Sequence, residues 1–224
     1  EAEPVPAPFQ AAADLEAPLE DWGPRVGADR GQPMTAGRIM HDADGVQVGS
    51  GEPREATVLF LDLEGFTTLS ERLAPQDLVR TLNAFYAAVA EPITQHDGVI
   101  TRLNAEYAAN AIQAALDIQA LLQERTFGEG LALRARIGIN TGVVIHGLIG
   151  TPDRLGYTVI GDEVNIAARL EALNKTYATS IIVSESTRDH AGAQRFAFAL
   201  LDEALVRGRT TPTRIYQVER AAAP

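Results

Sequence analysis

The sequence predicts an α+β domain in which helices pack on an antiparallel-rich sheet. Two observations lead to this prediction. Short apolar runs with strand character alternate with longer segments whose apolar residues recur every three or four positions, the spacing of a helix face. In addition, the order of elements mixes one hairpin with several strand–helix–strand crossings, which argues against an all-parallel doubly wound fold.

Residues 1–54 precede this domain and differ from it in composition. They are rich in Ala, Pro, Glu and Asp, and the proline spacing in EAEPVPAPF favours an extended linker over a packed core. An alternating stretch at 45–48 is interrupted at once by glycine and proline. We therefore expect a linker or N-terminal extension at 1–54, a folded domain at 55–220 and a tail at 221–224.

The folded domain opens with a buried strand at 56–62 that ends in a carboxylate, Asp62. Gly65, Phe66 and Thr67 follow, and then a helical pattern. A carboxylate at the end of a strand, followed by a glycine turn with free backbone N–H groups, can hold a cation and the phosphates that the cation neutralises. The alternative is that Asp62 is an ordinary turn residue and Gly65 a loop glycine.

The next elements are a helix, a strand and a second helix. The first helix begins near Pro75, a favoured first-turn residue, and a turn at 96–98 follows it. Residues 99–103 begin a second strand, but after Asn104 the sequence passes directly into an Ala-rich helical pattern at 105–122. This strand therefore lacks a hairpin partner. The face of the first helix that should pack on the sheet carries Leu78, Leu82, Phe85 and Val89.

The C-terminal half supplies the hairpin and the remaining strands. Alternation at 133–139 predicts a strand, the Asn-Thr-Gly sequence at 140–142 predicts a tight turn, and 143–149 is predicted as the second arm of the hairpin. The remaining elements are predicted as a strand at 157–160, a helix at 162–177, a strand at 181–183, a short helix capped by Ser184, and strands at 196–200 and 214–218.

Charge and cysteine content exclude several classes of function. The formal net charge of -11 argues against nucleic acid or anionic membrane as a general partner, so any phosphate binding must be local. The absence of cysteine excludes disulfides, thiol nucleophiles and zinc–thiolate sites. No apolar run approaches the roughly 20 residues of a spanning helix. Because the chain begins at Glu1 without an initiator Met, we expect an upstream sensor or membrane region outside it.

One pair of polar residues lies on the helix predicted at 162–177. Asn165 and Arg169 are four positions apart, so they project from the same face of that helix. An amide and a guanidinium aligned in this way can bind a ribose oxygen and a phosphate. Taken alone, the pair has a simpler interpretation as part of a solvated helix face.

Three segments together resemble the class III nucleotidyl cyclase catalytic domain: LFLDLEGFTTLSE, RIGINTGVVIHGLIG and YTVIGDEVNIAARLE. The similarity runs from about Ala56 to Val218, and three motifs in the right order are far more specific than any one of them. The resemblance implies a ferredoxin-like sheet and an obligate homodimer whose protomers pair head to tail and share their active sites. It also implies a cytoplasmic enzyme, or the cytoplasmic part of a membrane-anchored one.

For the first motif, the resemblance implies a metal and phosphate site. Asp62 matches a metal-binding aspartate, and the backbone carbonyl of Leu63 would contact the second of two Mg²⁺ or Mn²⁺ ions. The backbone amides of Gly65, Phe66 and Thr67 match the turn that holds the terminal phosphates of the nucleotide.

For the later motifs, the resemblance implies residues that act on the nucleotide from the partner protomer. Asn165 matches the residue that orients the ribose, and Arg169 the one that stabilises charge developing on the α-phosphate. Near the C-terminus, Arg207 and Arg209 lie where the family has a phosphate-binding lysine, and the alignment does not choose between them.

Arg102 and Thr158 occupy the positions at which the family reads the purine. Thr158 fits an adenylate-type subclass, Arg102 departs from the usual lysine, and neither matches the guanylate pattern. We therefore expect an adenylate cyclase that converts ATP to 3′,5′-cyclic AMP and pyrophosphate as the output domain of a signalling protein. The alternatives are a guanylate cyclase and a catalytically inactive, nucleotide-binding regulatory module.

The sequence departs from the family after Asn104. The family has a Gly-Asp pair there, whose aspartate is the second metal ligand, and then the rest of a hairpin; this segment is missing. A real deletion would remove a central strand and leave backbone groups unpaired, so we expect that the printed sequence omits the segment. If the deletion is real, the two-metal mechanism fails, which motivates the inactive alternative.

Overall fold

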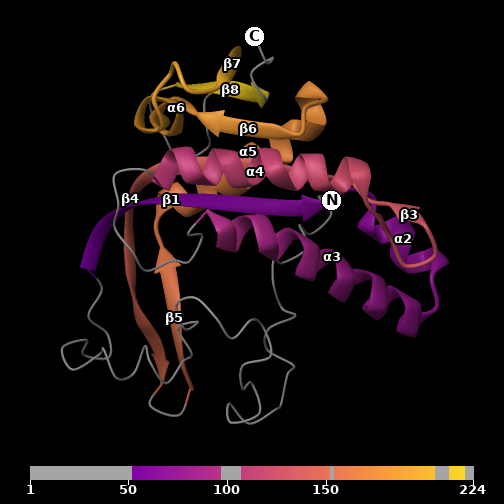
Figure 1. The fold of residues 1–224 in the computed structure, drawn as a ribbon. Coiled ribbons are helices and arrows are strands. Elements are labelled where there is room, and N and C mark those ends of the chain that lie inside the picture. Colours follow the sequence, from indigo (N-terminus) through magenta and orange to yellow (C-terminus); the bar gives the residue numbers. More distant parts are fainter. Residues whose placement is uncertain (1–51, 97–106, 152–153, 205–211, 220–224) are drawn as a thin grey trace, which may run out of the picture. The chain divides into compact units, whose positions relative to one another are not determined.

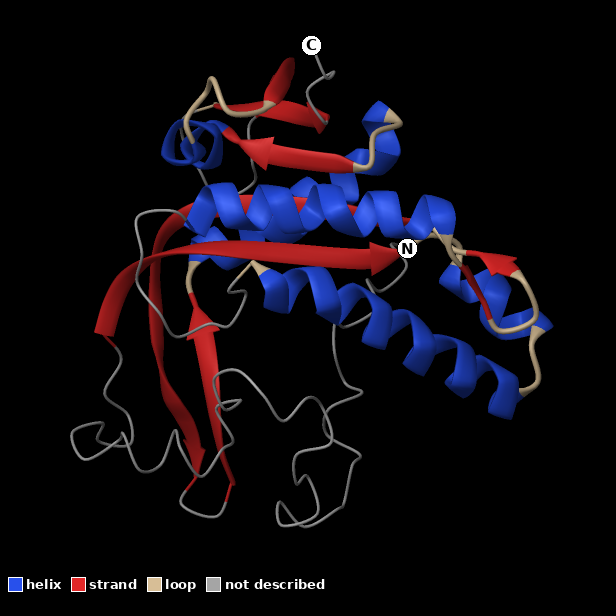
Figure 2. Cartoon of the chain, in the orientation of Figure 1, coloured by secondary structure: helices blue, strands red, loops and turns tan. Residues whose placement is uncertain are grey.

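A mixed, mostly antiparallel sheet forms the centre of the fold in the computed structural model (Figure 1, Figure 2). Its strand order is β1-β4-β6-β8-β7, and β5 pairs with β4 outside this path. Neighbouring strands are antiparallel except for β4 and β6, which are parallel. The predicted α+β, antiparallel-rich fold is therefore confirmed.

The structure describes residues 52–96, 107–151, 154–204 and 212–219. Most of the predicted linker and the predicted strand at 99–103 lie outside these ranges. The elements are β1 (Glu52–Leu63), α2 (Phe66–Arg72), α3 (Pro75–Gln95), α4 (Tyr107–Glu124), β2 (Thr126–Phe127), β3 (Leu131–Ala132), β4 (Ala135–Thr151), β5 (Arg154–Ile160), α5 (Asp162–Tyr177), β6 (Ile181–Ser184), α6 (Glu185–Ala191), β7 (Ala197–Ala204) and β8 (Thr213–Glu219).

The turn predicted at 140–142 is wrong, because β4 runs through these residues as one strand of 17 residues. Its ladder with β1 extends from the pair of Leu63 with Ala135 to the pair of Glu52 with His146. Residues 140–142 are paired with β1 like the residues before and after them. Pairing between strands therefore overrides the local turn preference. The hairpin instead joins β4 to β5, and the two strands extend together as an arm beyond the helices (Figure 1).

Helices cover both faces of the central sheet. On one face, α3 and α4 pack against strand residues such as Ile139 and Val183. On the other face, Ile166 and Leu170 of α5 pack against Ile182. Because side chains alternate along a strand, neighbouring residues of β6 serve opposite layers of the core. The predicted Ala-rich helix is α4, and it lies within the larger of these two layers.

Strand β1 has β4 as its one strand partner within the described residues. The backbone groups on its other edge are therefore available for a further strand. The strand predicted at 99–103 lies outside the described ranges, and the hairpin partner that the resemblance implies after Asn104 is missing from the sequence.

Candidate active site

Asp62 lies at the end of β1, directly before the turn into α2. Its side chain is exposed, whereas Leu63 beside it is buried in the core. The ladder places Asp62 opposite Arg136 on β4, and the N–H of Glu64 donates to the carbonyl of Arg134 at 2.8 Å. The strand end is thus fixed by β4, while the Asp62 carboxylate remains accessible to a ligand.

The carboxylate of Glu171 on α5 is close enough to Asp62 and Glu64 at this strand end to be affected by their charges. Burial, followed by the charges of Asp62 and Glu64, raises the pKa of Glu171 on α5 to about 7, although Arg136 lowers it. Arg136 Nε lies 3.4 Å from Glu64 Oε1.

The metal ligands are nevertheless incomplete in this part of the chain. Within the described ranges, no three His, Cys, Asp or Glu side chains are arranged to hold a metal ion. Asp62 therefore fits as one carboxylate ligand and the Leu63 carbonyl as a backbone ligand, and a further carboxylate has to come from elsewhere.

The glycine turn after β1 leaves backbone amides free at the start of α2. Gly65 adopts a left-handed conformation with a φ of 68°, which glycine allows without strain, and no side chain caps the helix. The first N–H groups of a helix have no acceptor within it. The amides of Phe66 and Thr67 are therefore available to an anion beside Asp62.

Helix α5 lies unusually close to β4 because Gly138 has no side chain. A Cβ at Gly138 would lie 2.1 Å from the backbone nitrogen of Glu171 and 2.3 Å from the carbonyl oxygen of Ala167. Near the other end of the helix, buried Asn174 donates to the carbonyl of Ile137 at 2.9 Å. These contacts fix the position of the helix that carries Asn165 and Arg169.

Asn165 and Arg169 are not among the buried residues of α5 that pack on the sheet. Asn165 is exposed and Arg169 is partly exposed. The Nη1 atom of Arg169 is buried and has no hydrogen-bond partner among the described residues. A guanidinium N–H without a partner favours binding of an anion such as a phosphate. The buried residues of α5 are Ile166, Ala167, Leu170 and Asn174.

The remaining predicted site residues are less well placed by the structure. Thr158 lies in β5 opposite Gly147 of β4. Arg102, Arg207 and Arg209 lie outside the described residues. Their roles therefore stay predictions.

Sequence reasoning missed two features of this site. Gly138 stands in the interior of a strand, where glycine often marks the close approach of another backbone, so a signal was present. Glu171 gave no such signal, because its proximity to Asp62 depends on how α5 lies on the sheet.

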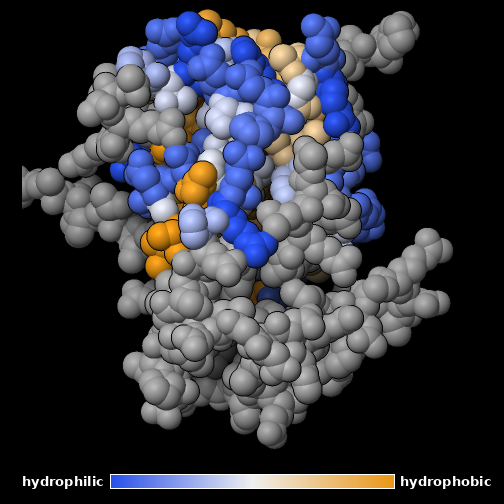
Figure 3. All heavy atoms as spheres, turned by 90° about the vertical axis from the view of Figure 1, so that its left-hand side faces the viewer, coloured by the Kyte–Doolittle hydropathy of each residue, from blue (hydrophilic) through white to orange (hydrophobic). Residues whose placement is uncertain are grey.

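An apolar patch is exposed on the arm formed by β4 and β5. Val143, Ile145 and Ile160 have exposed fractions of 60%, 47% and 50%. Val143 and Ile145 are two residues apart on one strand and Ile145 pairs with Ile160, so all three share one face. Figure 3 views the molecule from the left-hand side of Figure 1 and shows apolar surface among hydrophilic residues.

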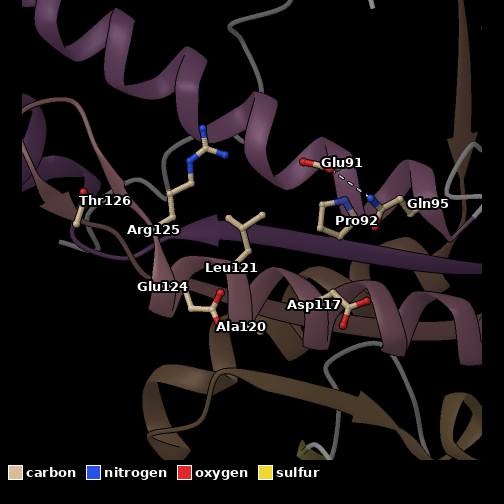
Figure 4. Close-up of a pocket in the computed structure, with 9 residues that line it drawn as sticks. All are labelled: Glu91, Pro92, Gln95, Asp117, Ala120, Leu121, Glu124, Arg125 and Thr126. Atoms are coloured by element: carbon tan, nitrogen blue, oxygen red, sulfur yellow. Dashed lines mark hydrogen bonds between the residues drawn. The ribbon is translucent and has the colours of Figure 1, made fainter. Parts of the chain in front are cut away.

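A separate groove of about 660 Å³ lies between α3 and α4 (Figure 4). Glu91, Gln95, Asp117 and Glu124 give it an acidic and polar lining, and Arg125 adds a single cation. None of the predicted site residues lines this groove, so it is not the candidate active site.

A family model described as the adenylate and guanylate cyclase catalytic domain matches residues 48–220. The chain belongs to this family. The cyclase domain is 32% identical over 183 residues to adenylate cyclase 1 of Rhizobium meliloti and 32% identical over 199 residues to an adenylate cyclase of Anabaena cylindrica. The two matches cover 74% and 79% of this chain but only 27% and 39% of those relatives, so the chain spans a minor part of their length.

Solved structures similar to this cyclase domain include both substrate classes. The adenylyl cyclase CyaB from P. aeruginosa matches with a TM-score of 0.66 at 26% identity, covering 77% of this chain and 97% of that one. The guanylate cyclase domain of RhGC from Catenaria anguillulae in complex with GTP matches with a TM-score of 0.66 at 25% identity, covering 75% and 98%. None of the described helices has the length and hydropathy needed to cross a bilayer.

Proposed function

We propose that this chain is the catalytic domain of a homodimeric adenylate cyclase that converts ATP to 3′,5′-cyclic AMP and pyrophosphate. The observation that carries the proposal is the distribution of charged groups around α5. Glu171 is on the flank near Asp62, whose charge contributes to its raised pKa. Arg169 is two positions earlier, a rotation of about 200° around the helix.

This distribution supports active sites that are shared between two protomers. Asp62 and the glycine turn would contribute to one site, while Asn165 and Arg169, on another side of α5, would contribute to the site of a second protomer. The apolar patch of Val143, Ile145 and Ile160 supports such an association, because exposed apolar surface on a protruding arm is typical of an interface. In a two-fold dimer, each protomer then completes the site of the other.

In the proposed mechanism, the residues of this chain position the nucleotide and stabilise charge. The amides of Gly65, Phe66 and Thr67 bind the terminal phosphates, with Arg207 or Arg209 as a further phosphate contact. The partner's pair acts at the reacting centre: Asn165 orients the ribose, and the unpartnered N–H of Arg169 stabilises charge on the α-phosphate.

The reaction is an in-line displacement at the α-phosphorus. The 3′-oxygen of the ribose forms the new bond, the bond to the pyrophosphate oxygen breaks, and the 3′-hydroxyl proton is released to solvent. Asp62 and the Leu63 carbonyl would hold Mg²⁺ or Mn²⁺, which activates the hydroxyl and neutralises the triphosphate when bound.

ATP is the proposed substrate rather than GTP. Thr158 at the base-reading position favours adenine, and the two curated relatives described above are named adenylate cyclases. Arg102 can donate to a ring nitrogen in place of the usual lysine. The second candidate function is an inactive nucleotide-binding module, favoured by the incomplete metal ligand set near Asp62 within the described residues.

Mixing two inactive variants of the full chain tests the proposal. Asp62→Ala and Arg169→Ala homodimers should each make no cyclic AMP from ATP with Mg²⁺ or Mn²⁺. Random re-pairing gives half heterodimers, each with one intact site, so the mixture should recover about a quarter of the wild-type activity. A wild-type chain that makes no product refutes the enzyme, a preference for GTP refutes the adenylate assignment, and a silent mixture refutes shared sites.

A further inference from the structure

We infer that Asn140 and Glu163 form a positioning pair that sets the first turn of α5, and with it the placement of Asn165. This inference rests on the proposed roles of Asn165 and Arg169. Asn140 is 2% exposed in the middle of β4, and its Nδ2 donates to the carbonyl oxygen of Glu163 at 3.0 Å and to Glu163 Oε2 at 2.7 Å. One buried amide thus holds both the backbone and the side chain of a single helix residue.

The start of α5 has no side-chain cap of its own, and the Asn140 contact attaches it to β4 without capping its N–H groups. Gly161 occupies the N-cap position and provides no capping hydrogen bond. Glu163 lies in the first turn, where a carboxylate is favoured by the helix dipole. Asn140 therefore attaches the first turn of α5 to β4 through two hydrogen bonds.

The geometry relates this attachment directly to the proposed chemistry. Asn165 follows Glu163 by two positions, about 200° around the helix, so Glu163 faces the sheet while Asn165 faces the predicted partner. The second attachment of the helix, Asn174, is 11 residues further along, about 16 Å. Two attachments so far apart fix both the direction of the axis and its rotation, and loss of Asn140 releases the end nearer to Asn165.

Gly142 of β4 provides further support for the position of the Glu163 side chain. A Cβ at Gly142 would lie 2.6 Å from the Cδ atom and 2.7 Å from the Oε2 atom of Glu163. The side chain of Glu163 therefore occupies the space that any other residue at 142 would fill. Gly142 thus has a packing role at a position where the sequence predicts a turn.

The experiment compares three variants of the full chain. Asn140→Ala removes the donor, Glu163→Gln keeps an acceptor oxygen at nearly the same place, and Thr187→Val is the matched control. Thr187 is fully buried, and its hydrogen bonds in the described structure go to Thr141, Ser184 and Ile139 rather than to α5. The control therefore loses a buried polar contact without disturbing the helix.

Two readouts separate positioning from general loss of stability. Asn140→Ala should lower kcat roughly 10- to 100-fold with little change in KM, while Glu163→Gln and Thr187→Val stay close to the wild-type kcat. Amide hydrogen exchange should accelerate at Ile166 and Ala167, whose N–H groups bond to the carbonyls of the first turn of α5, only in Asn140→Ala. The exchange measurement needs no catalysis, so it decides the inference even if the wild-type chain makes no cyclic nucleotide and the proposed function fails.

Several results would overturn the inference. One is an unchanged exchange rate at Ile166 and Ala167 in Asn140→Ala. The others are equal losses of kcat in Asn140→Ala and Thr187→Val at equal melting temperature, and a Glu163→Gln variant as impaired as Asn140→Ala.

Discussion

The close contact between α5 and β4 makes Gly138→Ala a quantitative test of the site geometry. The added Cβ would lie 2.1 Å from the backbone nitrogen of Glu171, whereas ordinary contact begins at 3.4 Å. The difference, 3.4 minus 2.1, requires a relative shift of 1.3 Å between strand and helix. Because the opposing atoms belong to the helix backbone, no side-chain rotation can relieve the clash.

This shift should reduce both stability and activity. Overpacking of a well-filled core costs about 1–3 kcal/mol, which for a domain of this size lowers Tm by about 2–12 °C. A displacement of about 1 Å at Asn165 and Arg169 should lower kcat by on the order of 100-fold. The loss of activity should therefore persist well below the melting transition.

The assay combines thermal melting with cyclic AMP formation at a temperature at which all variants are folded. Gly130→Ala is the control, because Gly130 has a φ of 85° that strains an alanine, but no atom lies within 4 Å of the added Cβ. The control should lose stability and keep kcat. A Gly138→Ala chain with the Tm and kcat of the wild type would show that the helix does not lie this close to the strand.

Three further predictions concern charge, association and a buried amide. The pKa of Glu171 is raised from 4.5 to about 7, so without divalent cations the free energy of unfolding should fall as pH rises between these values. The fall should be on the order of 1 kcal/mol, because the group is partly exposed. Denaturant titrations at both ends of this pH range should show the fall in the wild type and not in Glu171→Gln. Ile145→Asp should shift the proposed dimer toward monomer in sedimentation, whereas Leu200→Asp, at a residue that is 57% exposed on β7, should not. Asn174→Ala should lower the free energy of unfolding by about 1–3 kcal/mol, because it leaves the carbonyl of Ile137 buried without its donor; an unchanged denaturant midpoint would contradict this.

The elements with strong periodicity could be predicted from the sequence. The spacing of Phe85 and Val89 predicted α3, and both side chains are buried in it. The start of this helix at Pro75 was also correct, because proline is favoured in a first turn. Asp62 was placed correctly at the end of β1, since an apolar run followed by a carboxylate and a glycine turn marks a strand end.

The failures arose where distant pairing decides the local structure. Asn140 and Gly142 resemble turn residues, but one is a buried donor to Glu163 and the other makes room for it. The parallel pairing of β4 with β6 and the short strands β2 and β3 also escaped prediction, because neither follows from periodicity. The proximity of Glu171 to Asp62 depends on the docking of α5, which sequence spacing does not encode.

The unbroken course of β4 has a consequence for how this domain loses activity on heating. The strand pairs with β1, β5 and β6, and it also holds α5 through Gly138 and Asn140. Elements that share one strand in this way lose a common support when that strand unpairs. Heating that separates β4 from its partners should therefore free the Asp62 end of β1 and release α5 in the same step.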